Sequence, residues 1–377
     1  MPPTGHGCSK APGQDGFRRP KRIRMEEMAQ QAATVPLPPE EAPAQAPASG
    51  RAERRPVLKR SYGALDLGTN NCRLLIARPA ENGFVVIDAF SRVVRLGEGL
   101  ATRGRIADDA IERAVGALAV CAEKLRRRRV SLSRSVATEA CRRAVNGRHF
   151  VERVYRETGI ALEIISPEEE ARLAMLGCHR LLEPGDGPAL IFDIGGGSTE
   201  LILIDTDGGE PRIMSWWSAP WGVVSLTESE GRNFGDAKER LAAYGRMKER
   251  VRHAFSRFSE LLPARRSNIR LMGTSGTVTT LASVYLALPS YDRRAVDGLM
   301  MPSEKMREVS RMLSEMSLEE RSALPCIGSD RADLVVAGCA ILEAIMDIWP
   351  AETLGVADRG IREGILRSLM ARDGHSL

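Results

Sequence analysis

The chain has 377 residues, 43% of them hydrophobic and 27% charged, which is typical of a soluble globular protein large enough for two domains. Its formal net charge of +5 lies in residues 1–60, which hold 11 Lys and Arg against 6 Asp and Glu. The balanced charge of the remaining residues argues against a basic nucleic-acid-binding body. No apolar run is long and uncharged enough to predict a transmembrane helix.

Residues 1–60 are predicted to form a disordered tail. They contain 10 of the 21 prolines and little apolar periodicity, so they cannot offset the entropy of ordering. They also lack the continuous apolar segment of a secretory signal. The seven cysteines are scattered without a Cys-x-x-Cys pair, which indicates reduced thiols and predicts a cytoplasmic protein. The basic cluster FRRPKRIR either contacts nucleic acid or anionic lipid, or is simply a solvated part of the tail.

From Ser61 onward, strand patterns alternate with helix patterns, which predicts an α/β fold. In chain order, the first expected elements are strands at 61–68, 72–79 and 83–96, a helix at 108–129, a strand at 133–140, a helix at 148–159, a strand at 161–166 and a helix at 167–182.

The next stretch repeats the beginning of this series. PALIFDIGGGSTELILID (188–205) follows the pattern of YGALDLGTNNCRLLIARP (62–79): apolar strand, Asp, Gly, polar turn, apolar strand. This internal duplication predicts two similar α/β domains that face each other. The expected division is a tail at 1–60, an N-terminal domain at 61–185 and a C-terminal domain at 186–377. The final helix, within 360–373, is free to pack back on the first domain.

The two hairpin turns have the composition of phosphate-binding loops. In a turn of small residues, backbone N–H groups can point at phosphate oxygens. We expect Gly195, Gly196 and Gly197 to permit close approach, and Thr69, Asn70 and Ser198 to donate hydrogen bonds from their side chains. The alternative is a pair of tight hairpins without a ligand.

Acidic residues accompany both turns. Asp66 and Asp193 stand at the entrances, where a carboxylate can face phosphate only if a divalent cation lies between them. The pair therefore predicts a Mg²⁺ ion, held directly or through water, with Glu200 as a third candidate ligand. The five histidines show no metal-ligand spacing.

Two further features allow both a functional and a purely structural interpretation. The turn Gly273-Thr274-Ser275 either offers a helix N-terminus to an anion or simply caps that helix. Arg142 and Arg143 follow a predicted strand and either bind phosphate bidentately or form a surface pair. No G-x-x-x-x-G-K-[ST] motif is present, so the chain is not expected to contain a P-loop.

The stretch SPEEEARL predicts a helix start. Ser166, Pro167 and Glu169 have the spacing of a capping box. Helix stability accounts for Glu168 and Glu169, but the box leaves Glu170 without a structural role. A carboxylate beside a phosphate site, with no histidine nearby, could orient an attacking water. The alternative is that all three glutamates only start the helix.

Five motifs in this order resemble the exopolyphosphatase and guanosine pentaphosphate phosphatase family. They are YGALDLGTNNCRLL, SVATEACRRAVNG, IISPEEEARLAMLG, IFDIGGGSTEL and LMGTSGTVTTLAS, and the resemblance covers about residues 61–371. It implies two actin-like (ribonuclease H-like, ASKHA) domains with an interdomain cleft. The chain is similar to the short, two-domain members, which lack a further helical domain used for long substrates and dimerisation. The sequence leaves open whether the chain forms a homodimer.

The resemblance also implies roles for individual residues. Glu170 matches the catalytic base, and Arg142 matches the arginine of the strand–helix motif. The phosphate loops match Asp66 through Asn71, including Gly68, and Asp193 through Glu200, with magnesium expected there. The family usually has Ser where Asn71 stands, although an amide can still donate to phosphate.

The reaction that the resemblance implies is hydrolysis of a terminal phosphoanhydride bond, in inorganic polyphosphate, guanosine pentaphosphate or both. Neither nucleic acid nor a membrane is needed for it. Two other functions stay open. One is an ATP-dependent phosphotransferase of the same fold group, and the other is a non-catalytic sensor of guanosine polyphosphates.

Overall fold

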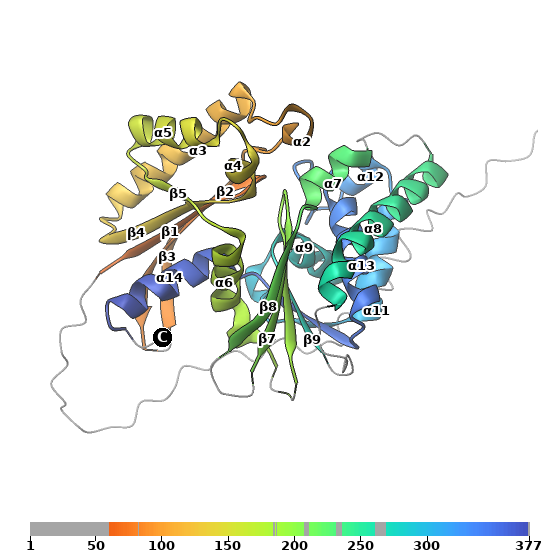
Figure 1. The fold of residues 1–377 in the computed structure, drawn as a ribbon. Helices are drawn as coiled ribbons and strands as arrows, with labels where there is room; N and C mark the ends of the chain where they lie inside the picture. Colours follow the sequence, from red (N-terminus) through yellow and green to blue (C-terminus); the bar gives the residue numbers. More distant parts are fainter. Residues whose placement is uncertain are drawn as a thin grey trace, which may run out of the picture.

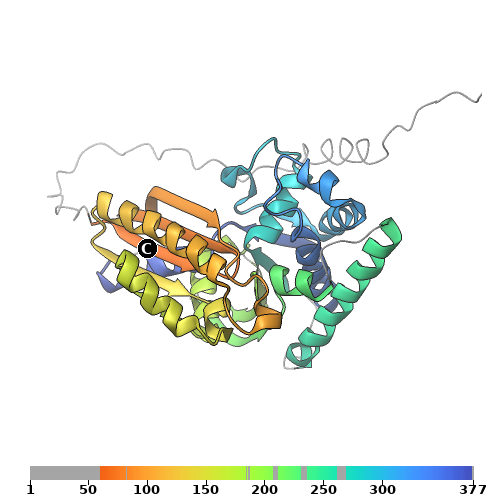
Figure 2. The same cartoon turned by 90° about the horizontal axis from the view of Figure 1, so that it is seen from above.

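The computed structural model describes residues 60–81, 83–183, 185, 187–206, 211–230, 236–260 and 269–375. The predicted tail lies outside this part of the chain, apart from Arg60. The described residues form two lobes that lie side by side, each built around one β-sheet with helices packed against it (Figures 1 and 2). The prediction of an α/β fold is confirmed.

The first lobe contains a five-stranded sheet. Its strands are β1 (Tyr62–Leu67), β2 (Asn71–Ala80), β3 (Gly83–Val93), β4 (Leu132–Ala137) and β5 (Leu162–Ile164), and its helices are α2 (Leu100–Arg103), α3 (Asp108–Arg127), α4 (Glu139–Arg143) and α5 (Gly147–Thr158). The strand order is β3-β2-β1-β4-β5. The first three strands are antiparallel neighbours, and β4 and β5 join in parallel. Apolar side chains at helical spacing on α3 and α5 bury against this sheet.

The second lobe repeats this arrangement. Its strands are β6 (Ala189–Ile194), β7 (Thr199–Asp205), β8 (Arg212–Ala219), β9 (Arg270–Thr274), β10 (Met300–Pro302) and β11 (Thr353–Ala357). The order β8-β7-β6-β9-β11 matches that of the first sheet, and β10 extends it at one edge. The predicted duplication is therefore confirmed, and the fold is two actin-like α/β domains. The helices are α7 (Val223–Glu230), α8 (Ala237–Glu260), α9 (Gly276–Tyr285), α10 (Arg293–Val296), α11 (Ser303–Glu315), α12 (Leu318–Ser322) and α13 (Val335–Ile348).

Two helices join the lobes. The helix α6 (Pro167–Cys178), continued by the 3-10 turn η1 (His179–Leu181), leaves the first lobe and contacts β7 and β8 of the second. The helix α14 (Ile361–Arg372) leaves the second lobe and contacts β1 and β2 of the first. They bury apolar side chains from both sheets in a shared core, including Leu75 and Ile202. Figure 1 shows both helices between the sheets.

The helices α6 and α14 cross at very short range. A Cβ atom added to Gly177 would lie 2.0 Å from the carbonyl oxygen of Gly360, and one added to Gly364 would lie 2.0 Å from that of Leu173. Only glycine lets the two backbones approach this closely. The glycines therefore fix the geometry of the link between the lobes.

Two other expectations concern the whole chain. Within the described residues, no helix combines the length and the apolar character that a membrane span requires. The six described cysteines are buried free thiols, among them Cys72 and Cys121, whose sulfur atoms lie 3.9 Å apart.

Candidate active site

A cavity of about 130 Å³ lies between the lobes, where the β1–β2 and β6–β7 turns meet the start of α6. Most of the predicted site residues line it: Asp66, Gly68, Thr69, Asn70, Asn71, Glu170, Asp193, Gly195, Gly196, Gly197, Ser198 and Ser275. Four predicted residues do not form its wall: Arg142, Glu200, Gly273 and Thr274. The structure thus brings residues from both duplicated hairpins to one site.

The two hairpin turns close in the same way. The N–H of Gly68 donates to the carbonyl of Asn71 at 2.9 Å, and the N–H of Gly195 donates to that of Ser198 at 3.0 Å. The carbonyls of Gly195 and Gly196 accept hydrogen bonds from the first residues of α7. In the described part of the chain, the N–H groups of Gly196 and Gly197 have no acceptor. These donors are therefore available to an anion.

Packing between the turns gives a second reason for the glycine run. A Cβ on Gly196 would lie 2.9 Å from the Cβ of Thr69, and a Cβ on Gly197 would lie 2.8 Å from its Oγ1. A Cβ on Gly222, just before α7, would lie 2.4 Å from the carbonyl carbon of Gly196. Glycine at these positions lets the two loops and the start of α7 pack together. This is a role in addition to any close approach of phosphate.

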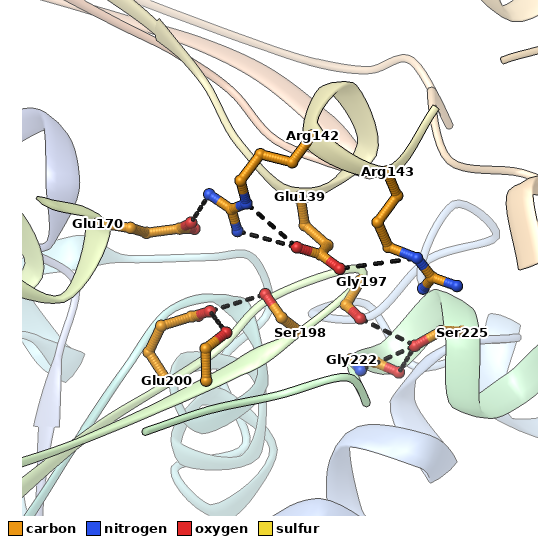
Figure 3. Close-up of polar contacts among 10 residues, drawn as sticks. Glu139, Arg142, Arg143, Glu170, Gly197, Ser198, Glu200, Gly222 and Ser225 are labelled. Carbon is orange, nitrogen blue, oxygen red and sulfur yellow. Dashed lines mark hydrogen bonds and ion pairs between the residues drawn. The ribbon is translucent and has the colours of Figure 1, made fainter. Parts of the chain in front are cut away.

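Glu170, which is buried, belongs to a chain of charges with the partly buried Arg142 and Glu139 (Figure 3). Its Oε2 lies 2.7 Å from Nη1 of Arg142, and Nη2 of Arg142 lies 3.0 Å from Oε2 of Glu139. The same guanidinium donates to the carbonyl of Ile165 at 2.9 Å. Arg142 therefore stands behind the cavity wall and holds two carboxylates that do line it.

The start of α6 separates Glu170 from its neighbour Glu169. Ser166 accepts a hydrogen bond from the N–H of Glu169 at 3.2 Å and Pro167 begins the helix, as predicted. The other hydrogen bond of the predicted capping box, from the N–H of Ser166 to the Glu169 carboxylate, is wrong. That carboxylate instead pairs with Arg134 at 2.6 Å and with Arg172 at 2.7 Å. These hydrogen bonds lower the pKa of Glu169 to about 2.

The pKa of Glu170 moves in the opposite direction. Burial raises it well above its ordinary value, repulsion from Glu200 adds to the rise, and Arg142 opposes it. Burial also raises the pKa of Glu200 to about 7, and burial together with Asp66 raises that of Asp193 to about 6. Carboxyl groups with pKa values near neutral can exchange protons at physiological pH. The site therefore has the electrostatics of acid–base chemistry.

The oxygen atoms of the first loop suit a hard cation. The Oδ1 atoms of Asp66 and Asn70 are buried, with no hydrogen-bond partner in the described chain. Glu200 is already engaged, because Ser198 and Ser218 donate to its Oε1 at 2.7 and 2.9 Å. The described residues contain no cluster of three His, Cys, Asp or Glu side chains that could hold a metal ion. The residues fit Mg²⁺ with few protein ligands, as it usually binds beside phosphates.

The third turn contributes less than its sequence suggests. Gly273 is a packing glycine, since a Cβ there would lie 2.7 Å from the ring of Phe192. Ser275 reaches the cavity with φ of 84°, and its Oγ donates to the carbonyl of Ile194 at 2.8 Å. It therefore ties β9 to β6 instead of capping α9 with its side chain.

The profile of the Ppx/GppA phosphatase family matches residues 75–373. The chain belongs to this family. Over 319 residues, it is 31% identical to exopolyphosphatase 2 of Mycobacterium tuberculosis, an alignment covering 81% of this chain and 97% of the relative. It is also similar to the crystal structure of the Aquifex aeolicus Ppx/GppA family member, with a TM-score of 0.69, 30% identity and coverage of 84% and 99%.

A second solved structure supports the fold of this family member. It is an exopolyphosphatase from Cytophaga hutchinsonii, with a TM-score of 0.73 at 24% identity, covering 84% of this chain and 99% of that one. The matches cover 97% of the Mycobacterium tuberculosis relative and 99% of the Aquifex aeolicus chain, so the two-lobed body corresponds to nearly the whole of both.

Sequence reasoning missed three charged residues that line the cavity: Glu139, Arg73 and Arg331. Glu139 lies in the same motif as Arg142, and its position just after β4 was the available signal. Arg73 interrupts an apolar strand, which is a signal for a charged residue with a function. Burial and the neighbouring Arg362 lower its pKa. Arg331 lies in an irregular segment where no pattern marks it.

Proposed function

We propose that this family member hydrolyses the terminal phosphoanhydride bond of inorganic polyphosphate, guanosine pentaphosphate or both, and releases orthophosphate. One observation carries the proposal. Glu170 is a buried carboxylate with a raised pKa, and it lines the same small cavity as the free N–H groups of Gly196 and Gly197. The relatives named as exopolyphosphatases support the same reaction class.

Each part of the cavity has a role in this reaction. The N–H groups of Gly196 and Gly197 bind oxygens of the transferred phosphoryl group, and Arg73 and Arg331 offset its charge. Glu170 orients a water molecule for in-line attack and accepts its proton. Arg142 is a positioning residue, because its ion pair fixes the carboxylate of Glu170.

A magnesium ion is part of the proposal. Asp66 and Asp193 would hold it, together with the free oxygen of Asn70. When bound, Mg²⁺ supplies positive charge that offsets the negative charge of the phosphates.

Two further contacts hold the lobes together. Arg95 of the first lobe pairs with Asp333 of the second at 3.2 Å, and the N–H of Gly99 donates to Glu228 at 2.7 Å. By keeping the lobes together, these contacts would help to exclude water from the cavity between them, and exclusion of water strengthens the charge interactions inside it.

The proposal is tested by measuring orthophosphate release from long polyphosphate and from guanosine pentaphosphate, side by side and without any acceptor. We expect sustained turnover at catalytic enzyme concentrations, and the two kcat/KM values identify the preferred substrate. A phosphotransferase would need ATP and an acceptor. A sensor would bind guanosine pentaphosphate without releasing more than one equivalent of phosphate. Either result would contradict the proposal.

The metal is tested separately. We expect excess chelator to abolish phosphate release and added Mg²⁺ to restore it, because buried carboxylates facing phosphate need a cation between them. Asp66→Asn should raise the Mg²⁺ concentration needed for half-maximal activity, while Asp108→Asn, an exposed carboxylate at the start of α3, should not. Full activity in excess chelator would remove magnesium from the mechanism.

A further inference from the structure

Glu139 lines the catalytic cavity, but the proposed reaction gives it no role. It begins the short helix α4, and its side chain is held from two sides. Within α4, its Oε2 accepts hydrogen bonds from Nε of Arg142 at 3.2 Å and from Nη2 at 3.0 Å. From the second lobe, Gly197 packs against it, since a Cβ added to Gly197 would lie 2.9 Å from Cγ of Glu139. The carboxylate is therefore held next to the predicted phosphate loop.

Arg142 divides its hydrogen bonds between two carboxylates (Figure 3). Its Nε and Nη2 face Glu139, whereas its Nη1 donates to Oε2 of Glu170 at 2.7 Å and to the carbonyl of Ile165 at 2.9 Å. Because Nη1 carries only two hydrogens, Glu170 receives a single N–H. Among the described residues, no hydrogen bond reaches the other carboxylate oxygen of Glu170, Oε1. That oxygen is available to a water molecule in the cavity.

Without Glu139, the guanidinium of Arg142 would have a second geometry available. Arginine commonly binds a carboxylate bidentately, with two parallel N–H groups on its two oxygens. Turned in this way towards Glu170, Arg142 would occupy Oε1 as well as Oε2. The base would then have no free oxygen for the water, and one positive charge would act on it undivided. Glu139 prevents this arrangement because it already holds Nε and Nη2.

The electrostatics agree with this division of one positive charge. Burial lowers the pKa of Arg142, but the charges of Glu170 and Glu139 outweigh burial, so that the pKa is raised. Burial and Glu200 raise the pKa of Glu170, and Arg142 lowers it. Charged side chains from other parts of the chain share the cavity with Glu170 or act on it: Asp66 of β1, Arg73 of β2, Asp193 of β6, Glu200 of β7, and Arg331. All of them are kept in the variants below, so a change in the pKa of Glu170 reports on α4.

We propose that Glu139 is a positioning residue for the base. It holds Arg142 in the orientation that leaves one oxygen of Glu170 free for the attacking water. It also takes a share of the positive charge that would otherwise make that base weaker. This inference rests on the proposed function, because it takes Glu170 as the base. Nε of Arg143 lies 3.8 Å from Oε1 of Glu139, so two arginines offset the negative charge that Glu139 brings near a phosphate.

Two substitutions separate the two parts of this role. Glu139→Gln keeps an oxygen that accepts from Arg142 but removes the charge. We expect the pKa of Glu170 to fall by about one unit, and the acid limb of kcat/KM to move to lower pH with it. The weaker base should lower kcat at its optimum by about threefold. Glu139→Ala also releases Nε and Nη2 of Arg142, so kcat should fall roughly tenfold to hundredfold with KM little changed.

The pKa of Glu170 is measured without substrate, from the NMR signal of its side-chain carboxyl carbon in full-length protein with isotope-labelled glutamate. The signal is assigned by its absence in Glu170→Gln. Steady-state phosphate release at several pH values gives the acid limb. The NMR titration does not depend on turnover, so a failure of the proposed phosphatase activity would leave its result unchanged.

Glu123→Gln is the matched control, because Glu123 forms the same i,i+3 pair with Arg126 on the exposed face of α3. It should leave both the pKa of Glu170 and kcat unchanged. An unchanged pKa of Glu170 in Glu139→Gln overturns the proposal, and so does a loss of thermal stability without any shift of the acid limb, which would show that Glu139 only supports α4. If Glu139→Ala loses its fold, the titration of Glu139→Gln decides alone.

Discussion

Adjacent residues with the same side chain can have opposite properties when their surroundings differ. Glu169 lies between Arg134 and Arg172 and keeps its charge, whereas Glu170 is only 6% exposed and binds its proton more tightly. One glutamate stabilises the helix start, and the other is available for proton transfer. The distinction depends on the direction in which each side chain leaves the first turn of α6.

The first prediction follows from this difference. Glu170→Gln keeps the size of the side chain and a hydrogen-bond acceptor for Arg142, but it removes the proton acceptor. We expect kcat to fall roughly 10²–10⁴-fold, the usual contribution of a positioned general base. KM should stay similar or drop, because a negative charge facing an anionic substrate is lost. Steady-state phosphate release measures both.

The control for this substitution is Glu168→Gln. Glu168 belongs to the same glutamate run but is exposed and lies outside the cavity wall. It should leave kcat within about twofold of the native value. Equal losses in the two variants would show that the run only starts a helix and that the base lies elsewhere.

Glu200 gives a prediction about stability and pH. Burial raises its pKa from 4.5 to about 7, so the folded state holds this proton more tightly than the unfolded state. The contribution of the group to stability is therefore full below pH 4.5 and is lost as the pH rises through 7. The Gln side chain of Glu200→Gln does not ionise, so this variant does not lose stability as the pH rises. It keeps a side-chain oxygen that accepts hydrogen bonds from Ser198 and Ser218.

We therefore expect the free energy of unfolding of Glu200→Gln, relative to the native protein, to improve by about 3 kcal/mol between pH 4.5 and pH 8. Denaturant unfolding at several pH values measures it. Glu168→Gln controls for the removal of one negative charge from the surface. A flat difference across this range would mean that Glu200 titrates as an ordinary exposed carboxylate.

How far the site could be predicted depends on what made each residue unusual in the sequence. Glu170 was unusual because the capping pattern did not need it, and the glycine loops were unusual because they occur twice. Glu139 looked like an ordinary first-turn acid. Its Oε2 lies 3.0 Å from Nη2 of Arg142 through a local i,i+3 contact within α4, but only the fold places it on the cavity wall. No local sequence pattern marks Arg331, because it belongs to a segment far along the chain from the two hairpins and reaches the cavity only in the folded protein.

Among the elements, the duplicated hairpins made the topology predictable. The same order of apolar strand, polar turn and apolar strand produces the same closing hydrogen bond and the same sheet order in both lobes. Other elements carried weaker signals. The strand β8 and the long helix α8 were not predicted, and β8 is an edge strand with only partial burial. Contacts between elements, such as Thr69 against Gly196, depend on docking and cannot be read from local patterns.

The crossing of α6 and α14 yields a prediction at this scale. Gly364→Ala places a methyl group 2.0 Å from the carbonyl oxygen of Leu173, so the two backbones must move apart. We expect a loss of about 1–3 kcal/mol in the free energy of unfolding, or more, which is the usual cost of overpacking. Because α6 carries Glu170, kcat should also fall. Thermal unfolding and steady-state kinetics test both effects.

The matched control is Gly245→Ala in α8. A Cβ added there meets no atom within 4 Å, and the residue is exposed within a helix. Alanine should therefore stabilise the protein by about 0.5–1 kcal/mol through its higher helix propensity. If the two substitutions change stability by the same sign and amount, the close crossing is not what fixes the lobes.

At the scale of the molecule, the catalytic cavity depends on how the lobes are joined, because it takes its walls from both duplicated hairpins and from the start of α6. The hairpin residues could be predicted from sequence patterns. The arginines of the cavity could not, because Arg73 and Arg331 lie far apart in the sequence and meet only in the folded chain. The predicted tail behaves differently, since its properties depend on composition alone.

The last prediction concerns this tail. Residues 1–60 hold the whole net charge of +5 and none of the motifs that form the cavity. Removal of residues 1–55 should therefore leave kcat unchanged. KM for long polyphosphate should rise modestly at low ionic strength, because a basic arm attracts a polyanion through charge that salt screens over about 10 Å at 0.1 M. Steady-state kinetics at two salt concentrations separates these effects.

The matched control keeps the full length and replaces Arg18, Arg19, Lys21, Arg22 and Arg24 with Gln. If charge alone matters, this variant and the truncated chain should show the same rise in KM at low salt and none at high salt. A rise that persists at high salt would instead indicate specific contacts from the tail. A large fall in kcat on truncation, with the fold intact, would place the tail in the active site and contradict its assignment as a separate, unstructured segment.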